Sequence, residues 1–167
     1  MSRLAGEIVD LLRRKGLTLG LVESATGGLI SHLITNVPGS SDVYTGSVTS
    51  YSNDAKARIV GVSTDSIEQY GAVSPQVAGE MAQGGRRLLN VDICVADTGI
   101  AGPGGATPEK PVGLFYIGLS HRGGTFNRKH VFSGDREANK RAAAETALTW
   151  LKEYLESLRD VRNSFRD

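Results

Sequence analysis

Residues 43–56 read VYTGSVTSYSNDAK and join a strand pattern to the start of a helix. β-Branched and aromatic side chains predominate from Val43 to Tyr51, which predicts a strand, and Gly46 within it indicates a bulge. Ser52 or Asn53 can cap the following helix, because both side chains accept hydrogen bonds from backbone amides of a first helical turn. A strand that leads directly into a helix is the repeating unit of an α/β fold.

The segments on either side repeat this alternation. Apolar side chains at helical spacing precede Gly16, residues 17–22 form a short apolar strand, and helical spacing resumes after Gly28. Ser74-Pro75 is a helix start, and residues 91–96 form a third apolar strand. Helices therefore alternate with the first three strands, which favours parallel pairing among them.

The C-terminal part predicts a hairpin and a long helix. Residues 112–119 and 125–132 are strand-like and flank Arg122-Gly123-Gly124, a glycine turn. Asp135 can cap the last helix, whose apolar stripe extends to Leu158. Together the elements predict a three-layer α/β/α sandwich around a mixed, mostly parallel sheet that ends in an antiparallel hairpin.

Length and composition favour one domain. With 167 residues, of which 40% are hydrophobic, the chain is long enough to bury a single core. We assign residues 1–159 to that domain and residues 160–167 to a polar tail. No apolar run approaches the ~18 residues of a membrane span, and the first residues do not read as a signal peptide, so the expected location is the cytoplasm.

Charge and metal-ligand patterns argue against several function classes. The 19 Lys and Arg residues nearly balance the 18 Asp and Glu residues, which disfavours nucleic acid or an anionic membrane as a partner. Cys94 is the only cysteine and lies in an apolar run, so we expect a buried structural thiol. His32, His121 and His130 are scattered without metal-ligand spacing, and we expect no metal site.

Three polar, glycine-rich segments should meet at one edge of the sheet. Glu23 to Gly28, the residues around Tyr51, and Thr98 to Gly105 each follow a predicted strand. In open α/β sheets, ligands bind outside the carboxyl ends of the strands. The small residues after Thr98 have amides that can bind a phosphate or an oxyanion, although their spacing matches neither the P-loop nor the dinucleotide fingerprint.

Lys56 is the strongest candidate for a catalytic base. It falls in the first turn of its predicted helix, where the positive end of the helix dipole and partial burial both lower the pKa of the amine. A neutral lysine can deprotonate a serine. By spacing alone, Ser41 and Ser40 in the loop before the strand, and Ser24 in the first polar segment, are alternative nucleophiles.

Other side chains fit binding or relay roles. The hydroxyl group of Tyr51 can orient the nucleophile or relay a proton, although a tyrosine in a strand more often belongs to the core. Arg136 follows Ser133-Gly134-Asp135 at the start of the last helix, where it can pair with a substrate phosphate or serve only in a salt bridge. Glu23 can orient groups of the first polar segment.

Several motifs, taken together, resemble a known family. They are ESATGG (23–28), VPGSSDVY (37–44), SYSNDAKARIVGV (50–62), YGAVSPQVA (70–78), DTGIAGPGGATPEKPVG (97–113) and FSGDR (132–136). These strings resemble the C-terminal domain of the competence/damage-inducible protein CinA, a domain that also occurs alone as nicotinamide mononucleotide deamidase. The resemblance covers residues 4–158 and implies a three-layer α/β/α fold with a five-stranded mixed sheet.

The resemblance also implies an activity. Such a hydrolase converts nicotinamide mononucleotide and water into nicotinate mononucleotide and ammonia, in the recycling of pyridine nucleotides, with a serine and lysine pair and without metal or organic cofactor. The lysine of the family falls on Lys56, its tyrosine on Tyr51 and its serine on Ser41, our preferred nucleophile, with Ser24 in reserve. The expected substrate-binding residues are Thr98, Gly99, Gly102, Gly104, Gly105, Arg136, Glu23 and Thr26.

One departure from the family pattern leaves an alternative open. The family usually has cysteine where this chain has Ala25. If that thiol is required, the chain is a catalytically inactive nucleotide-binding or regulatory module. The match concerns only the C-terminal domain of CinA, so the pyrophosphatase activity associated with its N-terminal domain is not expected. We also expect a homo-oligomer, with a dimer as the first guess.

Overall fold

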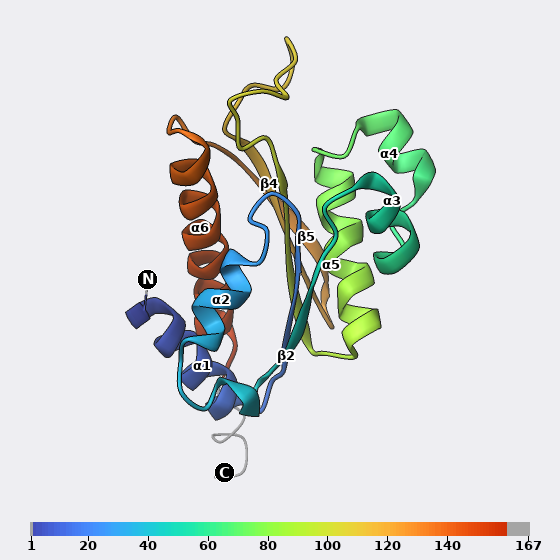
Figure 1. The fold of residues 1–167 in the computed structure, drawn as a ribbon. Coiled ribbons are helices and arrows are strands. Elements are labelled where there is room, and N and C mark those ends of the chain that lie inside the picture. Colours follow the sequence, from blue (N-terminus) through green and yellow to red (C-terminus); the bar gives the residue numbers. More distant parts are fainter. Residues whose placement is uncertain (1, 160–167) are drawn as a thin grey trace.

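A computed structural model describes residues 2–159 and shows one five-stranded sheet between two layers of helices (Figure 1). The strands lie in the order β2 (Tyr44–Thr49), β1 (Leu19–Glu23), β3 (Ile93–Gly99), β4 (Leu114–His121) and β5 (Gly124–Val131). β1 pairs in parallel with β2 and β3, whereas β4 runs antiparallel to β3 and β5. The predicted α/β/α architecture is confirmed. The predicted tail, residues 160–167, lies outside the described residues.

The helices divide between the two faces of the sheet. One face is covered by α1 (Ser2–Lys15), α2 (Leu29–Thr35) and α6 (Arg136–Ser157) (Figure 1). The other is covered by α5 (Pro75–Leu89), with α3 (Asn53–Ala55), the π-helical turn η2 (Lys56–Val60) and α4 (Thr64–Tyr70) outside it. A short 3₁₀ turn, η1 (Ser40–Asp42), precedes β2.

Two apolar cores fill the spaces on either side of the sheet. Ile8, Leu21 and Leu151 belong to the core under α1, α2 and α6, whereas Val22 and Met81 belong to the core under α5. Successive residues of β1 thus enter opposite cores, and the whole strand is buried. A central strand that is buried on both faces is expected to be apolar throughout.

The predicted helix caps explain where several helices begin. Ser52, Ser74 and Asp135 each accept a hydrogen bond from the backbone amide three residues later, and Ser63 caps α4 in the same way. These bonds satisfy amides that have no partner within the helix. The bulge predicted near Gly46 is also present, because the register between β1 and β2 shifts opposite Tyr44 and Gly46.

The helix predicted after Ser52 is not a regular α-helix. Three residues of α3 lead into η2, and the turn closes at Gly61, which has a φ of 80°. A π-helical turn widens the backbone and occurs often at functional sites. Here it carries Lys56, which is buried, toward the end of the sheet.

The register of the parallel strands aligns their carboxyl ends. Glu23 at the end of β1 lies opposite Thr49 at the end of β2, and Val22 lies opposite Ala96 of β3. The chain segments that leave these strands therefore emerge at the same edge. The expectation that Ser24, Tyr51 and Thr98 would meet there is confirmed, because all three line one pocket.

Helix α5 packs closely against η2 at Gly84. A Cβ atom at Gly84 would overlap the carbonyl oxygen of Val60, so we expect Gly84→Ala to lower the free energy of unfolding by about 1–3 kcal/mol through overpacking. Gly79→Ala is the matched control in the same helix. Its Cβ would lie 3.6 Å from Thr125 Cγ2, and the higher helix propensity of alanine should stabilise by up to about 1 kcal/mol. Equal effects of both substitutions in denaturant unfolding would contradict this packing.

Candidate active site

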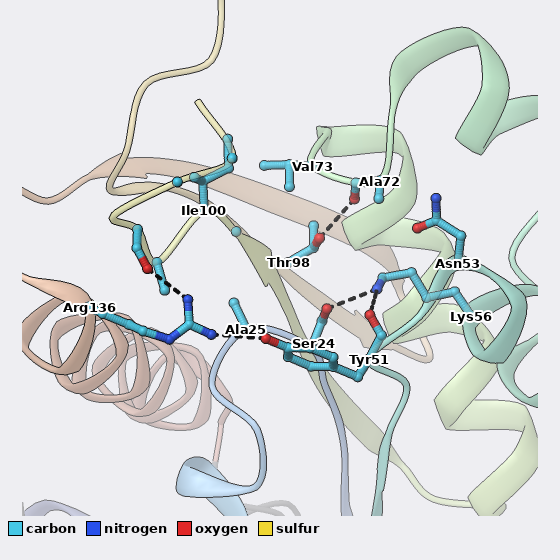
Figure 2. Close-up of a pocket in the computed structure, with 15 residues that line it drawn as sticks. Ser24, Ala25, Tyr51, Asn53, Lys56, Ala72, Val73, Thr98, Ile100 and Arg136 are labelled. Carbon is cyan, nitrogen blue, oxygen red and sulfur yellow. Dashed lines mark hydrogen bonds between the residues drawn. The ribbon is translucent and has the colours of Figure 1, made fainter. Parts of the chain in front are cut away.

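A pocket of about 300 Å³ lies beyond the carboxyl ends of the parallel strands (Figure 2). It is built from five separate segments, namely the loop after β1, residues 51–56 after β2, the α4–α5 connection, the end of β3 with its following loop, and the start of α6. Nine of the residues expected from the sequence line it: Ser24, Tyr51, Lys56, Thr98, Gly99, Gly102, Gly104, Gly105 and Arg136.

Lys56 and Ser24 form the central contact of the pocket. Lys56 Nζ lies 2.9 Å from Ser24 Oγ, 3.0 Å from the carbonyl oxygen of Ser50 and 3.2 Å from that of Tyr51 (Figure 2). A neutral amine has two N–H donors and one lone pair. The two carbonyl oxygens take the donors, which leaves the lone pair of a neutral Lys56 facing the hydroxyl proton of Ser24.

Burial is the main reason why the neutral, proton-accepting form of Lys56 is favoured. The residue is only 2% exposed, and desolvation lowers its pKa, while the negative charge of Asp97 acts in the opposite direction. The partial burial from which we predicted this shift is thus present, and Lys56 directly follows the three-residue helix α3, as the first residue of η2.

Ser41 lies at the opposite end of β2 from Lys56, so its predicted approach to the lysine is wrong. It belongs to η1, before β2, and six strand residues separate η1 from the pocket, a span of about 20 Å. There Arg13 donates hydrogen bonds to the Gly39 carbonyl and to Asp42, holding this loop against α1. Ser40 lies in the same turn, which leaves Ser24 as the serine next to the lysine.

Tyr51 and Arg136 meet across the mouth of the pocket. Arg136 Nη2 donates to the Tyr51 hydroxyl at 2.9 Å, and Nη1 donates to the Gly102 carbonyl at 2.7 Å (Figure 2). Tyr51 is 62% exposed and lies just beyond β2, so the alternative of a core tyrosine is wrong. Arg136 has no carboxylate partner among the described residues, which contradicts the alternative of a plain salt bridge.

Thr98 is placed at the pocket but its hydroxyl group is already engaged. β3 continues through Gly99, so Thr98 is the second-last residue of a strand and does not belong to the loop that follows. Its hydroxyl donates to the Ala72 carbonyl at 2.8 Å, which ties β3 to the segment before α5. Beyond it, the glycine-rich loop projects from the edge of the sheet and presents Gly102, Gly104 and Gly105 to the pocket (Figure 1).

Glu23 and Thr26, predicted to bind substrate, lie beneath the pocket instead. Both are at most 1% exposed, and neither lines the cavity. Glu23 accepts three backbone amide hydrogen bonds from the start of α2, those of Gly28, Ile30 and Ser31. Its carboxylate therefore anchors the helix that follows the Ser24 turn.

Asp97 lies beneath the pocket and was not among the candidate residues from the sequence. It is fully buried next to Thr26, and its carboxylate oxygens accept the amides of Ser24 and Thr26. Burial is the main cause that raises its pKa to about 6, and the neighbouring Glu23 adds to it. An acidic residue at the end of an otherwise apolar strand was the signal in the sequence.

Two further observations concern the described part of the chain. Residues 2–159 contain no cluster of three or more His, Cys, Asp or Glu side chains that could hold a metal ion, and no helix among them is both long and apolar enough to cross a membrane.

Cys94 is buried in the core under α5, as expected, and burial raises the pKa of its thiol to about 12.

Curated relatives with similar sequences are longer proteins that are named competence-damage inducible or CinA-like proteins. The chain is 47% identical to a putative competence-damage inducible protein of Moorella thermoacetica, over 83% of this chain and 33% of that protein. It is also 47% identical to a CinA-like protein of Thermotoga neapolitana, over 89% of this chain and 36% of the relative. The chain thus spans about one third of the length of these relatives.

Solved structures of the same family match the fold over almost their full length. A competence/damage inducible protein of Agrobacterium tumefaciens superposes with a TM-score of 0.90 at 37% identity and covers 93% of this chain and 95% of that one. The competence damage-inducible protein A of Klebsiella pneumoniae gives 0.91 at 29% identity, over 95% and 98%. The family model of the CinA C-terminal domain matches residues 1–155, and the chain therefore belongs to the CinA C-terminal domain family.

Proposed function

We propose that this protein is a nicotinamide-nucleotide amidase that hydrolyses the carboxamide of nicotinamide mononucleotide to nicotinate mononucleotide and ammonia. The observation that carries the proposal is the contact of a buried, deprotonation-prone Lys56 with the hydroxyl group of Ser24 at 2.9 Å. A serine and lysine pair in a polar pocket can cleave an amide without a metal. The nucleotide substrate is inferred from the family resemblance.

In the proposed reaction, Ser24 is the nucleophile and Lys56 the general base. Lys56 Nζ takes the Ser24 proton as Oγ forms a bond to the carboxamide carbon, which gives a tetrahedral oxyanion. The carbon–nitrogen bond then breaks, the ammonium form of Lys56 returns the proton to the leaving nitrogen, and ammonia departs. A water molecule next attacks the acyl-enzyme; Lys56 takes its proton and passes it to Ser24 Oγ as the ester bond breaks.

The mouth of the pocket supports recognition of the 5′-phosphate. Arg136 is the first residue of α6, so the helix N-terminus adds to its own positive charge. The neighbouring Gly104 and Gly105 line the same pocket and bring backbone close to it. A phosphate that binds here would compete with Tyr51 for the guanidinium group of Arg136.

The proposed mechanism is compatible with alanine at position 25. The proton transfers are assigned to Ser24 and Lys56, and the side chain at position 25 takes no part in them. The alternative hypothesis is a catalytically inactive nucleotide-binding module. It predicts saturable binding of the nucleotide with no release of ammonia.

Substitution of the two reacting residues tests the mechanism. We expect Ser24→Ala and Lys56→Met each to reduce ammonia release from nicotinamide mononucleotide by more than about 10³-fold, because the two groups act as a unit. Ser41→Ala is the matched control and should keep the wild-type rate, since Ser41 lies at the far end of β2. Circular dichroism and unfolding midpoints would verify that the variants are folded. Undiminished turnover in either Ser24→Ala or Lys56→Met would remove that residue from the mechanism.

The pH dependence of the reaction follows from Lys56. Only the neutral amine can accept the proton of Ser24, so kcat/KM should rise with pH and level off above the pKa of Lys56. Because burial lowers that pKa from its usual 10.5, the plateau should be reached below pH 10.5. A profile that still rises through pH 10.5, in protein shown to be folded there, would contradict the role of burial.

Arg136 can be tested with a pair of substrates that differ in the phosphate. Arg136→Gln should raise KM for nicotinamide mononucleotide by about tenfold or more, because a hydrogen bond to a charged group is worth ~1.5–3 kcal/mol. The effect on nicotinamide riboside, which lacks the phosphate, should be much smaller. Arg141→Gln in the same helix is the control, since Arg141 pairs with exposed Glu137 and does not line this pocket. Equal losses with both substrates would argue against phosphate binding by Arg136.

A further inference from the structure

A buried cluster of two carboxyl groups and one hydroxyl group lies directly beneath the Ser24 turn. Glu23 and Asp97 are fully buried, and Thr26 is 1% exposed. Thr26 Oγ1 lies 2.6 Å from Glu23 Oε2 and also makes a short hydrogen bond with Asp97 Oδ1. A threonine hydroxyl has one proton and can donate to only one of these oxygens. The second contact therefore requires a further proton, carried by one of the two carboxyl groups.

The hydrogen bonds around the cluster indicate which carboxyl group carries it. Glu23 accepts three backbone amides at 2.8–3.0 Å in addition to Thr26, which is one amide more than Asp97 accepts, and at shorter distances. Asp97 accepts only two amides, at 3.1 and 3.2 Å, and faces the charge of Glu23 in a site without solvent. The proton therefore belongs on Asp97, which donates it to Thr26, while the Thr26 hydroxyl donates to Glu23.

The same carboxyl group organises the backbone that follows the nucleophile. Asp97 Oδ1 accepts the amide of Ser24, and Oδ2 accepts the amide of Thr26. The amide between them, that of Ala25, has no hydrogen-bond partner in the described part of the chain, and Ala25 lines the pocket (Figure 2). An unpaired amide on the residue after a nucleophilic serine is suitably placed to bind the oxyanion of a tetrahedral intermediate.

We propose that Asp97 is the positioning residue of this site: its carboxyl group fixes the amides of Ser24 and Thr26, and so holds the Ala25 N–H free to bind the oxyanion, and in acid it carries the proton of the buried cluster. The oxyanion step rests on the proposed amidase function. The protonation state does not, because it follows from the contacts of Thr26. The proposed role of residue 25 belongs to its backbone amide. Alanine and cysteine have the same backbone amide, so either residue can fill this role.

Infrared spectroscopy tests whether Asp97 is protonated, without any measurement of activity. We expect the difference spectrum between wild type and Asp97→Asn at pH 5 to contain the carbonyl stretching band of one protonated carboxylic acid, because this pH lies below the pKa of about 6 that burial gives Asp97. Carboxyl groups common to both proteins cancel in the difference. A carboxylate band in place of the acid band would overturn the assignment of the proton.

The pH dependence of stability gives an independent readout of the same proton. The charged groups that act on Asp97 are Glu23 from β1, which raises its pKa, and Lys56 from η2. The folded-state pKa of about 6 lies above the ordinary value of 3.8, so the folded protein binds more protons between these values. The unfolding midpoint of wild type relative to Asp97→Asn should therefore fall as pH rises from about 4 to 6, and then stay level. A constant or rising difference would contradict the proposal.

Kinetics separate a positioning role from a merely structural one. Asp97→Ala removes the hydrogen bonds between Asp97 and the turn. We expect kcat to fall about 10²–10³-fold with KM changed by less than about threefold, since the oxyanion exists only after attack. Asp97→Asn can still donate to Thr26 and accept one amide, so its kcat should be intermediate; this variant also serves if Asp97→Ala does not fold. Wild-type kcat in either folded variant would overturn the positioning role. If the wild-type protein releases no ammonia, both the proposed amidase function and the oxyanion step are refuted. The protonation of Asp97 would then be decided by the infrared spectrum alone.

Discussion

The burial of one lysine amine at the carboxyl edge of the sheet is the constraint on which the site depends. An uncompensated ammonium ion in this position would be strongly unfavourable, so Lys56 either neutralises or finds partners. Its partners are two backbone carbonyl oxygens and Ser24 Oγ, which come from two different strand ends. The lysine therefore connects the β1 and β2 loops, and Val60 of the π-helical turn that carries it packs against Gly84 of α5.

A second set of buried polar contacts supports the first from below. Glu23 ties the start of α2 to the end of β1, and Asp97 ties the Ser24 turn to β3. Neither residue lines the pocket. The charge of Asp97 nevertheless acts on Lys56, because a carboxylate at Asp97 favours the ammonium form of the lysine. The protonation of the supporting residues and the basicity of the lysine are therefore coupled.

The opposite side of the pocket is held by weaker and more exposed contacts. Arg136 contacts the Tyr51 hydroxyl and the Gly102 carbonyl, which joins three segments that no strand pairing connects. Hydrogen bonds at an exposed mouth contribute little to stability and exchange readily with those of a ligand. The pocket thus combines a buried contact between Lys56 and Ser24 with a more exposed rim that carries Tyr51 and Arg136.

The sequence by itself determined the architecture and most of the pocket. Hydrophobic periodicity and helix caps such as Ser74 and Asp135 depend on local chemistry, so the order of strands and helices could be read directly. The parallel arrangement then placed the loops after Ser24, Tyr51 and Thr98 at one edge. Only the tertiary structure decided which serine meets Lys56. Ser41 and Ser24 are both serines near turns, and the choice depends on strand direction, which puts one at each end of the sheet. The role of Asp97 was likewise hidden, because its partners lie more than 70 residues away in the chain and only β1–β3 pairing brings them together.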